Sequence, residues 1–217
     1  MGAASAAPEE GHMGVKVAVL VGSLRERSYN HRLALALQRL GPPDWEYVGV
    51  RIDEVPHFDQ DLEDDAPDSV RRLKETIEAA DALMFVTPEY NRSVPGVLKN
   101  AIDWASRPKK RNSFAGKPAL VAGASTGNIG TAVAQSHLRM TLAYLDVPAM
   151  GQPEVYVKFS PEDLIDMEGN VTVPDTERFL RGVMAAFARW VETVGAGRVA
   201  AQGDARATVP GGRPPAP

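Results

Sequence analysis

Short runs of apolar residues alternate along the chain with segments in which apolar residues recur every three or four positions. The run at residues 15–21 is rich in valine, as expected for a central strand of a parallel sheet covered on both faces. The segments between the runs carry one apolar face, the pattern of an amphipathic helix. The alternation predicts strands at residues 15–21, 45–52, 82–86, 118–122 and 154–157, and helices at residues 30–40, 68–80, 95–106, 130–145 and 175–193.

Five strands that alternate with five helices indicate an α/β fold with a doubly wound parallel sheet, because parallel strands need helical crossovers of one hand. The 217 residues suit a single domain with a substantial core. We expect a flexible extension at residues 1–14, one domain at residues 15–195, and a disordered Gly-, Ala- and Pro-rich tail at residues 196–217. In the last helix, the predicted buried face comprises Phe179, Val183, Phe187, Trp190 and Val194.

The amino-acid composition excludes several kinds of functional site. The chain has no cysteine, which excludes disulfides, thiolate nucleophiles, iron–sulfur clusters and Cys-type zinc sites and fits a cytoplasmic protein. A net charge of −4 gives no indication of a surface for nucleic acid or for anionic membranes. No apolar run approaches the length of a membrane span. The four histidines show no metal-ligand spacing, and the acidic run at 59–65 lacks the spaced ligands of a calcium loop, so we predict no metal site.

The loop after the first predicted strand, residues 22–30, reads Gly-Ser-Leu-Arg-Glu-Arg-Ser-Tyr-Asn. It brings hydroxyl groups, the guanidinium of Arg25 and a helix N-terminus together, and these groups suit a phosphate monoester. It contains neither the G-x-G-x-x-G pattern of dinucleotide folds nor the G-K-[ST] of triphosphate loops. An ordinary turn with Ser28 or Asn30 as the helix cap is an equally good interpretation of the spacing alone.

Two further loops follow the third and fourth predicted strands. Residues 87–95 hold Tyr90 and polar side chains between two prolines, which suits contact with a planar ring, although a rigid surface turn also explains them. Residues 123–130 contain three glycines and two hydroxyl residues, which allow a ligand close to the backbone or simply form a flexible connection. All three loops leave the carboxyl ends of parallel strands, where ligands of such sheets bind.

Two of these segments carry a resemblance to a known family. G-S-L-R-x-x-S-x-N after the first strand, followed by T-P-E-Y-N-x-S-x-P-G-x-L-K-N-A-I-D-W, resembles the NADPH-dependent FMN reductases, a family that includes bacterial chromate, quinone and azo-dye reductases. The resemblance implies a flavodoxin-like, three-layer fold with strand order 2-1-3-4-5, and FMN bound without a covalent link. It also implies a homodimer or homotetramer.

The resemblance further implies positions for the cofactor. The phosphate would lie against Ser23, Arg25, Ser28 and Asn30. The isoalloxazine ring would be lined by Pro88, Glu89, Tyr90 and Asn91 on one side and by Ser125, Thr126 and Gly127 on the other.

The expected activity is an NAD(P)H-dependent oxidoreductase that passes electrons through FMN to a small acceptor: a quinone, chromate, an azo compound or free flavin. The chemistry belongs to the cofactor, so no catalytic side chain is predicted. A shared site for NADPH or NADH and for the acceptor predicts ping-pong kinetics. The alternative is a flavodoxin-like electron carrier without its own NAD(P)H turnover, although the arginine in the first loop and the small net charge favour the enzyme.

Overall fold

The computed structural model describes residues 14–207. Within them one parallel sheet is formed by β1 (Lys16–Val21), β2 (Glu46–Gly49), β3 (Ala82–Val86), β4 (Ala119–Ser125) and β5 (Val155–Lys158). The spatial order is β2-β1-β3-β4-β5, and every neighbouring pair is parallel. The predicted flavodoxin-like fold and its strand order are therefore confirmed.

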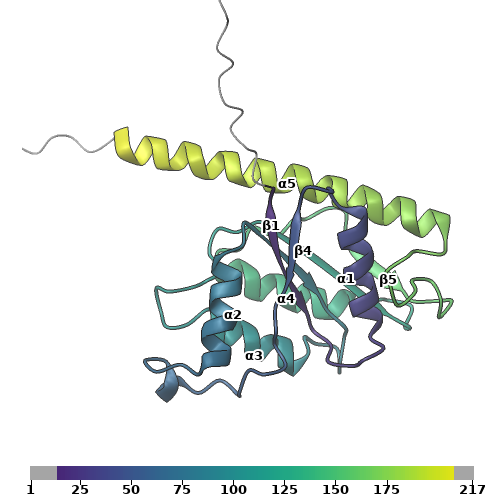
Figure 1. Ribbon diagram of the computed structural model, residues 1–217, viewed down its shortest axis with the longest axis horizontal. Coiled ribbons are helices and arrows are strands. Elements are labelled where there is room, and N and C mark those ends of the chain that lie inside the picture. The colour runs from purple at the N-terminus through teal and green to yellow at the C-terminus, as the bar shows by residue number, and fades with distance from the viewer. Residues whose placement is uncertain (1–13, 208–217) are drawn as a thin grey trace, which may run out of the picture.

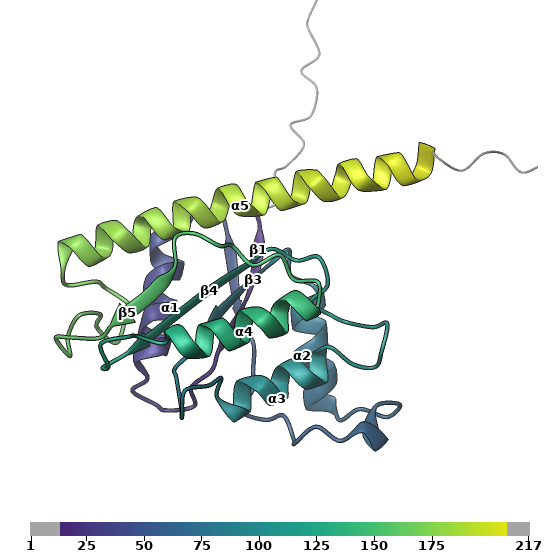
Figure 2. The same cartoon turned by 180° about the vertical axis from the view of Figure 1, so that it is seen from behind.

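Helices cover both faces of this sheet (Figures 1 and 2). On one face lie α1 (Tyr29–Leu40) and α5 (Pro174–Ala207). On the other lie α2 (Asp68–Glu78), α3 (Gly96–Ala105) and α4 (Ala132–Tyr144), and a short 3₁₀ turn, η1 (Gln60–Leu62), precedes α2. The result is the three-layer arrangement that the alternating pattern predicts.

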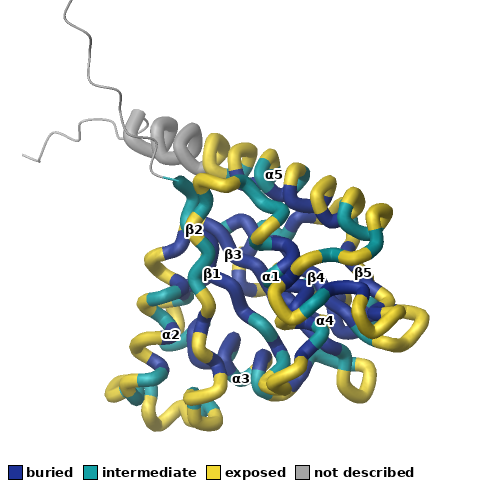
Figure 3. Tube along the Cα trace, turned by 45° about the vertical axis from the view of Figure 1, so that its right-hand side comes forward, coloured by how far each residue is buried: buried dark blue, intermediate teal, exposed yellow. Residues whose placement is uncertain are grey.

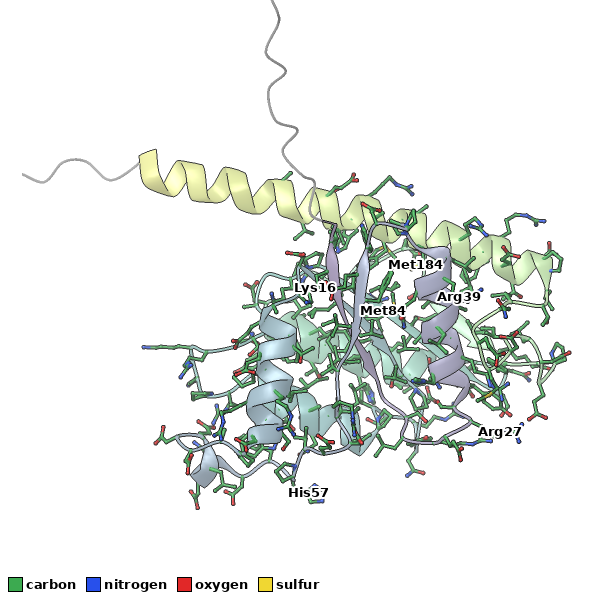
Figure 4. All side chains as sticks on the ribbon, in the orientation of Figure 1. Lys16, Arg27, Arg39, His57, Met84 and Met184 are labelled. Carbon is green, nitrogen blue, oxygen red and sulfur yellow. The ribbon has the colours of Figure 1, made fainter. Side chains whose placement is uncertain are left out.

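The sheet separates two apolar cores, and β3 contributes to both. Met84 faces the core under α1 and α5, where it joins Met184 of α5 (Figure 4). Phe85 faces the core under α2, α3 and α4. Every residue of β3 is buried, as are the central residues of β1 and β4 (Figure 3). Burial on both faces explains why these strands appear in the sequence as continuous apolar runs instead of alternating ones.

The second strand is shorter than predicted. Pairing with β1 ends where Gly49 lies opposite Val19, and the N–H of Val50 then makes a last bond of 2.9 Å to the carbonyl of Val19. Val50 and Ile52 are the apolar positions that extended the predicted strand to residue 52. Both are buried in the core under α2, α3 and α4, but neither belongs to a strand. Their burial comes from packing beyond the edge of the ladder, which the alternating pattern cannot distinguish from strand pairing.

The last helix differs from the prediction in its length and its buried face. Up to residue 197, the buried side chains of α5 are Leu180, Val183, Met184, Phe187 and Val191, whereas Phe179, predicted to face inward, is 42% exposed. The helix continues to Ala207 instead of ending at residue 193, so the predicted boundary at 195 falls inside it, and residues 196–207 are helical where a disordered tail was predicted. The other predicted segments, 1–13 and 208–217, lie outside the described residues. Despite the length of α5, we find no helix between residues 14 and 207 that is long and apolar enough to cross a membrane.

Candidate functional site

A cavity lies at the carboxyl edge of the sheet, next to the point between β1 and β3 where the crossover connections diverge to opposite sides. Ligands of doubly wound sheets bind at this switch point. The loops after β1, β3 and β4 meet around a volume of about 230 Å³. Its walls are formed by Ser23, Arg25, Ser28, Tyr29, Asn30, Pro88, Glu89, Tyr90, Ala124, Ser125 and Thr126. The structure thus brings together the predicted site residues of all three loops, with Asn91 and Gly127 as the exceptions.

The first loop presents hydrogen-bond donors at the N-terminus of α1. The hydroxyl of Ser28 accepts from the N–H of His31 at 3.3 Å and caps the helix, as the sequence suggested. This leaves the N–H groups of Tyr29 and Asn30 in the first turn without an intrahelical acceptor. The guanidinium of Arg25 is exposed and lies over the ring of Tyr29, 5.3 Å from its centroid. Backbone donors, the positive helix end and a cation together fit a phosphate monoester.

The side chain of Asn30 joins the first loop to β4. Its Nδ2 donates to the carbonyl of Ala124 at 2.9 Å, and its Oδ1 accepts from the N–H of Ala124 at 2.8 Å. Both hydrogen-bonding atoms of the amide are used on β4, and the residue is only 3% exposed. Asn30 therefore clamps the first loop to the fourth strand, and the part that it would play in binding a ligand stays a prediction.

The side chain of Glu89 connects the second loop to α4. Its Oε2 accepts from the N–H groups of Val133 and Ala134, both at 3.0 Å, at the start of a helix whose own cap residue, Thr131, makes no side-chain cap bond. A carboxylate at this position is favourable because the N-terminus of a helix is positive. Glu89 lines the cavity, but its charge is directed at the helix. Glu89 therefore links the second loop to α4, the helix that follows the third loop.

The rest of the second loop is a tight turn at the rim of the cavity. Pro88 is buried, whereas Tyr90 is 52% exposed. Tyr90 and Ser93 exchange backbone hydrogen bonds of 3.2 and 3.0 Å, and the two residues between them have positive φ angles. Asn91 thus forms the turn and is not among the residues that line the cavity, and its place beside the ring stays a prediction.

The third loop contributes two of its three predicted residues to the cavity. Ser125 and Thr126 line the cavity, whereas the N–H of Gly127 donates to the hydroxyl of Ser125 at 3.0 Å and Gly127 lies outside the lining. A side chain at Gly123 would clash, since its Cβ would lie 2.0 Å from Oγ1 of Thr131 and 2.4 Å from the carbonyl of Thr87. A glycine is required at position 123 for β4 to pass this close to its neighbours.

Two lining residues, Tyr29 and Ala124, were absent from the prediction. The ring of Tyr29 stacks on that of Phe159, with centroids 4.3 Å apart, and so holds the start of α1 against the segment after β5. The signal for Tyr29 was its place between Ser28 and Asn30 in the first motif. No sequence signal pointed to Ala124, because an alanine contributes only its backbone here.

The fold and this cavity define the class of the protein: a doubly wound α/β protein with a cavity at its switch point, whose lining would suit a phosphate-bearing planar ligand. Residues 15–162 match the family described as NADPH-dependent FMN reductase. A 2-hydroxy-1,4-benzoquinone reductase from Burkholderia sp. is 50% identical over 179 residues, which cover 82% of this chain and 97% of that protein. A quinone reductase from Pseudomonas putida is 43% identical over 81% of this chain and 94% of that protein.

Among solved structures, a flavoenzyme NAD(P)H:(acceptor) oxidoreductase from Paracoccus denitrificans is similar, with a TM-score of 0.79 and 47% sequence identity over 82% of this chain and 98% of that one. The chain belongs to the NADPH-dependent FMN reductase family. It is an oxidoreductase whose cofactor is FMN and whose co-substrate is NAD(P)H. The family, the enzyme class and the cofactors inferred from the two motifs are confirmed.

Proposed function

We propose that the protein is an NAD(P)H:quinone oxidoreductase in which FMN occupies the cavity at the β1–β3 switch point. The observation that carries the proposal is the convergence of three loops on one cavity with a phosphate-binding end, at Arg25 and the start of α1, and an end suited to a planar ring, at Pro88 and Tyr90. When bound, FMN supplies the redox chemistry by taking two electrons from NAD(P)H as a hydride and passing them to the acceptor.

The residues of the chain would bind and orient the cofactor. Arg25 and the backbone donors of Tyr29 and Asn30 would hold the phosphate. Pro88 and Tyr90 would lie along one side of the ring, with Ser125 and Thr126 along the other. Tyr90 and Thr126 are exposed, which leaves an approach from solvent for the donor and then the acceptor. One approach used in turn by both is the basis for proposing ping-pong kinetics.

Small quinones are the proposed acceptors. The relative from Burkholderia sp. is named for the reduction of a hydroxylated 1,4-benzoquinone, and the relative from Pseudomonas putida for that of a quinone. 1,4-Benzoquinone is uncharged and planar, so it suits the same approach to the flavin ring as the nicotinamide of the donor. Chromate, azo compounds and free flavin are the further acceptors to compare.

A homodimer or homotetramer in the cytoplasm is part of the proposal. On α4, Met140 is 67% exposed and Tyr144 is 85% exposed, beside a groove of about 510 Å³ between α3 and α4. Large apolar side chains gathered at one groove are typical of protein contacts. Light scattering on the eluting peak of a size-exclusion column measures the oligomeric state.

The decisive experiment is an absorbance spectrum of the purified protein, repeated without air after NADPH and then after 1,4-benzoquinone. We expect a flavin spectrum that bleaches on NADPH and returns on addition of the quinone. A flavin that stays oxidised with both NADPH and NADH would favour an electron carrier. A protein that binds no flavin even after incubation with FMN would contradict the proposal at its first step.

A further inference from the structure

The turn at the rim of the cavity holds an arginine in a backbone conformation that suits glycine. Asn91 and Arg92 are the two central residues between Tyr90 and Ser93, with φ angles of 50° and 61°. Positive φ at both positions is the mark of a type I′ turn, in which Asn-Gly is the preferred pair. Asparagine therefore fits its position, whereas arginine occupies a position at which residues other than glycine are uncommon.

The fold itself gains little from the side chain of Arg92. That side chain is 69% exposed. Within the described part of the chain, its one ion pair is with Oε1 of Glu89, at 3.4 Å and through a single nitrogen. Such a pair on the surface contributes little to stability. The other oxygen of Glu89 is already held by two N–H groups of α4, so the pair with Arg92 is not needed to position that carboxylate.

Arg92 nevertheless lies beside the approach to the cavity. Its neighbours in the loop, Glu89 and Tyr90, both line the cavity, and Arg25 lines it from the first loop. The rim thus carries guanidinium groups on two loops. FMN has one phosphate, which Arg25 and the start of α1 would accommodate. The hydride donor brings further phosphates: every nicotinamide dinucleotide has a pyrophosphate, and NADPH also has a 2′-phosphate. Because Arg25 would already bind the phosphate of FMN, the guanidinium of Arg92 is available for a phosphate of the donor.

We propose that Arg92 binds a phosphate group of the nicotinamide dinucleotide. The proposal rests on the proposed function, because it requires the donor to approach through this cavity. Residues with strained backbone conformations are often found at functional sites, and a role in binding the donor would explain why Arg92 occupies this turn. Arginine suits the task because its planar group can meet a phosphate through two hydrogen bonds and is always charged.

The substitution Arg92→Gly separates binding from folding, because glycine is the better residue for this turn. We expect the melting temperature to stay the same or rise, and the FMN dissociation constant to stay the same. In ping-pong kinetics kcat/KM for each substrate reports its own half-reaction. We expect kcat/KM for NADPH to fall about tenfold, while kcat/KM for 1,4-benzoquinone, which carries no phosphate, is unchanged. NADP⁺, which cannot reduce the flavin, should bind about tenfold more weakly to the FMN-loaded variant in calorimetry.

Lys110→Gly is the matched control. Lys110 is also an exposed cation with a positive φ angle, 77°, but it lies in the loop after α3. The same changes in charge and backbone there should leave all these constants unaltered. An equal loss in both variants would overturn the proposal in favour of a general effect of net charge, and unchanged NADPH constants in Arg92→Gly would overturn it directly.

Comparison of NADPH with NADH identifies the phosphate. A loss confined to NADPH assigns Arg92 to the 2′-phosphate, and an equal loss for both assigns it to the pyrophosphate. A parallel fall in kcat/KM for the quinone would overturn the proposal, because Arg92 would then act on the flavin site as a whole. Failure of the proposed function is distinguishable, since it would show in the wild-type protein as flavin that NADPH does not bleach.

Discussion

Replacement of Asn30 by alanine tests whether this residue is a structural clamp or a ligand contact. The amide makes two hydrogen bonds to the backbone of Ala124, at 2.9 and 2.8 Å, and Ala124 is 2% exposed. A buried polar group left without its partner costs about 1–3 kcal/mol. With two such groups on Ala124, we expect the apoprotein to lose about 2–6 kcal/mol of unfolding free energy, a large part of the roughly 5–15 kcal/mol typical of a domain.

Urea unfolding of the flavin-free protein measures this loss without a contribution from the cofactor. FMN affinity should fall as well, because the clamp holds the first loop to β4. Asn128→Ala is the control: Asn128 is an exposed asparagine in the third loop, and its replacement should change stability by less than about 0.5 kcal/mol. If Asn30→Ala weakens FMN binding while the apoprotein keeps its full stability, the clamp interpretation is refuted and Asn30 acts on the ligand directly.

Four further outcomes are expected. Arg25→Ala should weaken FMN binding about 10- to 100-fold in a fluorescence titration, since a hydrogen bond to a charged group is worth about 1.5–3 kcal/mol, and an unchanged affinity would place the phosphate elsewhere. Tyr29→Leu should weaken it about two- to fivefold by removing the cation–π contact with Arg25, worth about 0.5–1 kcal/mol, and the added loss should be smaller in the Arg25→Ala background, where only the contacts with Phe159 and Arg32 remain to be removed. Truncation after Gly195 should leave melting temperature and flavin content intact, because the residues at 192–197 are exposed or half-buried, and an insoluble product would contradict this. Burial lowers the pKa of Lys74, so the unfolded chain binds its proton more tightly, and stability should rise with pH up to the ordinary lysine pKa; in Lys74→Met this rise should be smaller in urea unfolding at stepped pH.

The sequence predicted the elements that depend on local periodicity. β3 was predicted with its observed bounds, because its five residues are all buried and appear as one apolar run. The prediction failed at apolar residues whose environment does not follow from their spacing. Val50 and Ile52 are buried without being in a strand, and Phe179 is apolar yet exposed. Periodicity shows that a residue is apolar, but the neighbouring elements decide whether its face is covered.

The three loops of the site were also predicted, since polar loops after parallel strands must meet at one edge of the sheet. The roles within those loops were not. Asn30 and Glu89 were expected to contact FMN, whereas the structure uses their side chains to hold β4 and α4 in place. Whether these residues also meet the cofactor through other atoms stays a prediction.

By itself, the sequence of this protein determined its class: an apolar pattern for a doubly wound sheet, and two motifs specific enough to indicate a flavin reductase. Only the tertiary structure decided which side chains at the site are bonded to neighbouring elements, as those of Asn30 and Glu89 are. The physical reason is distance along the chain. A strand or a helix cap arises between near neighbours, whereas the clamp from Asn30 to Ala124 spans 94 positions and exists only because the packed sheet brings those two residues within hydrogen-bond distance.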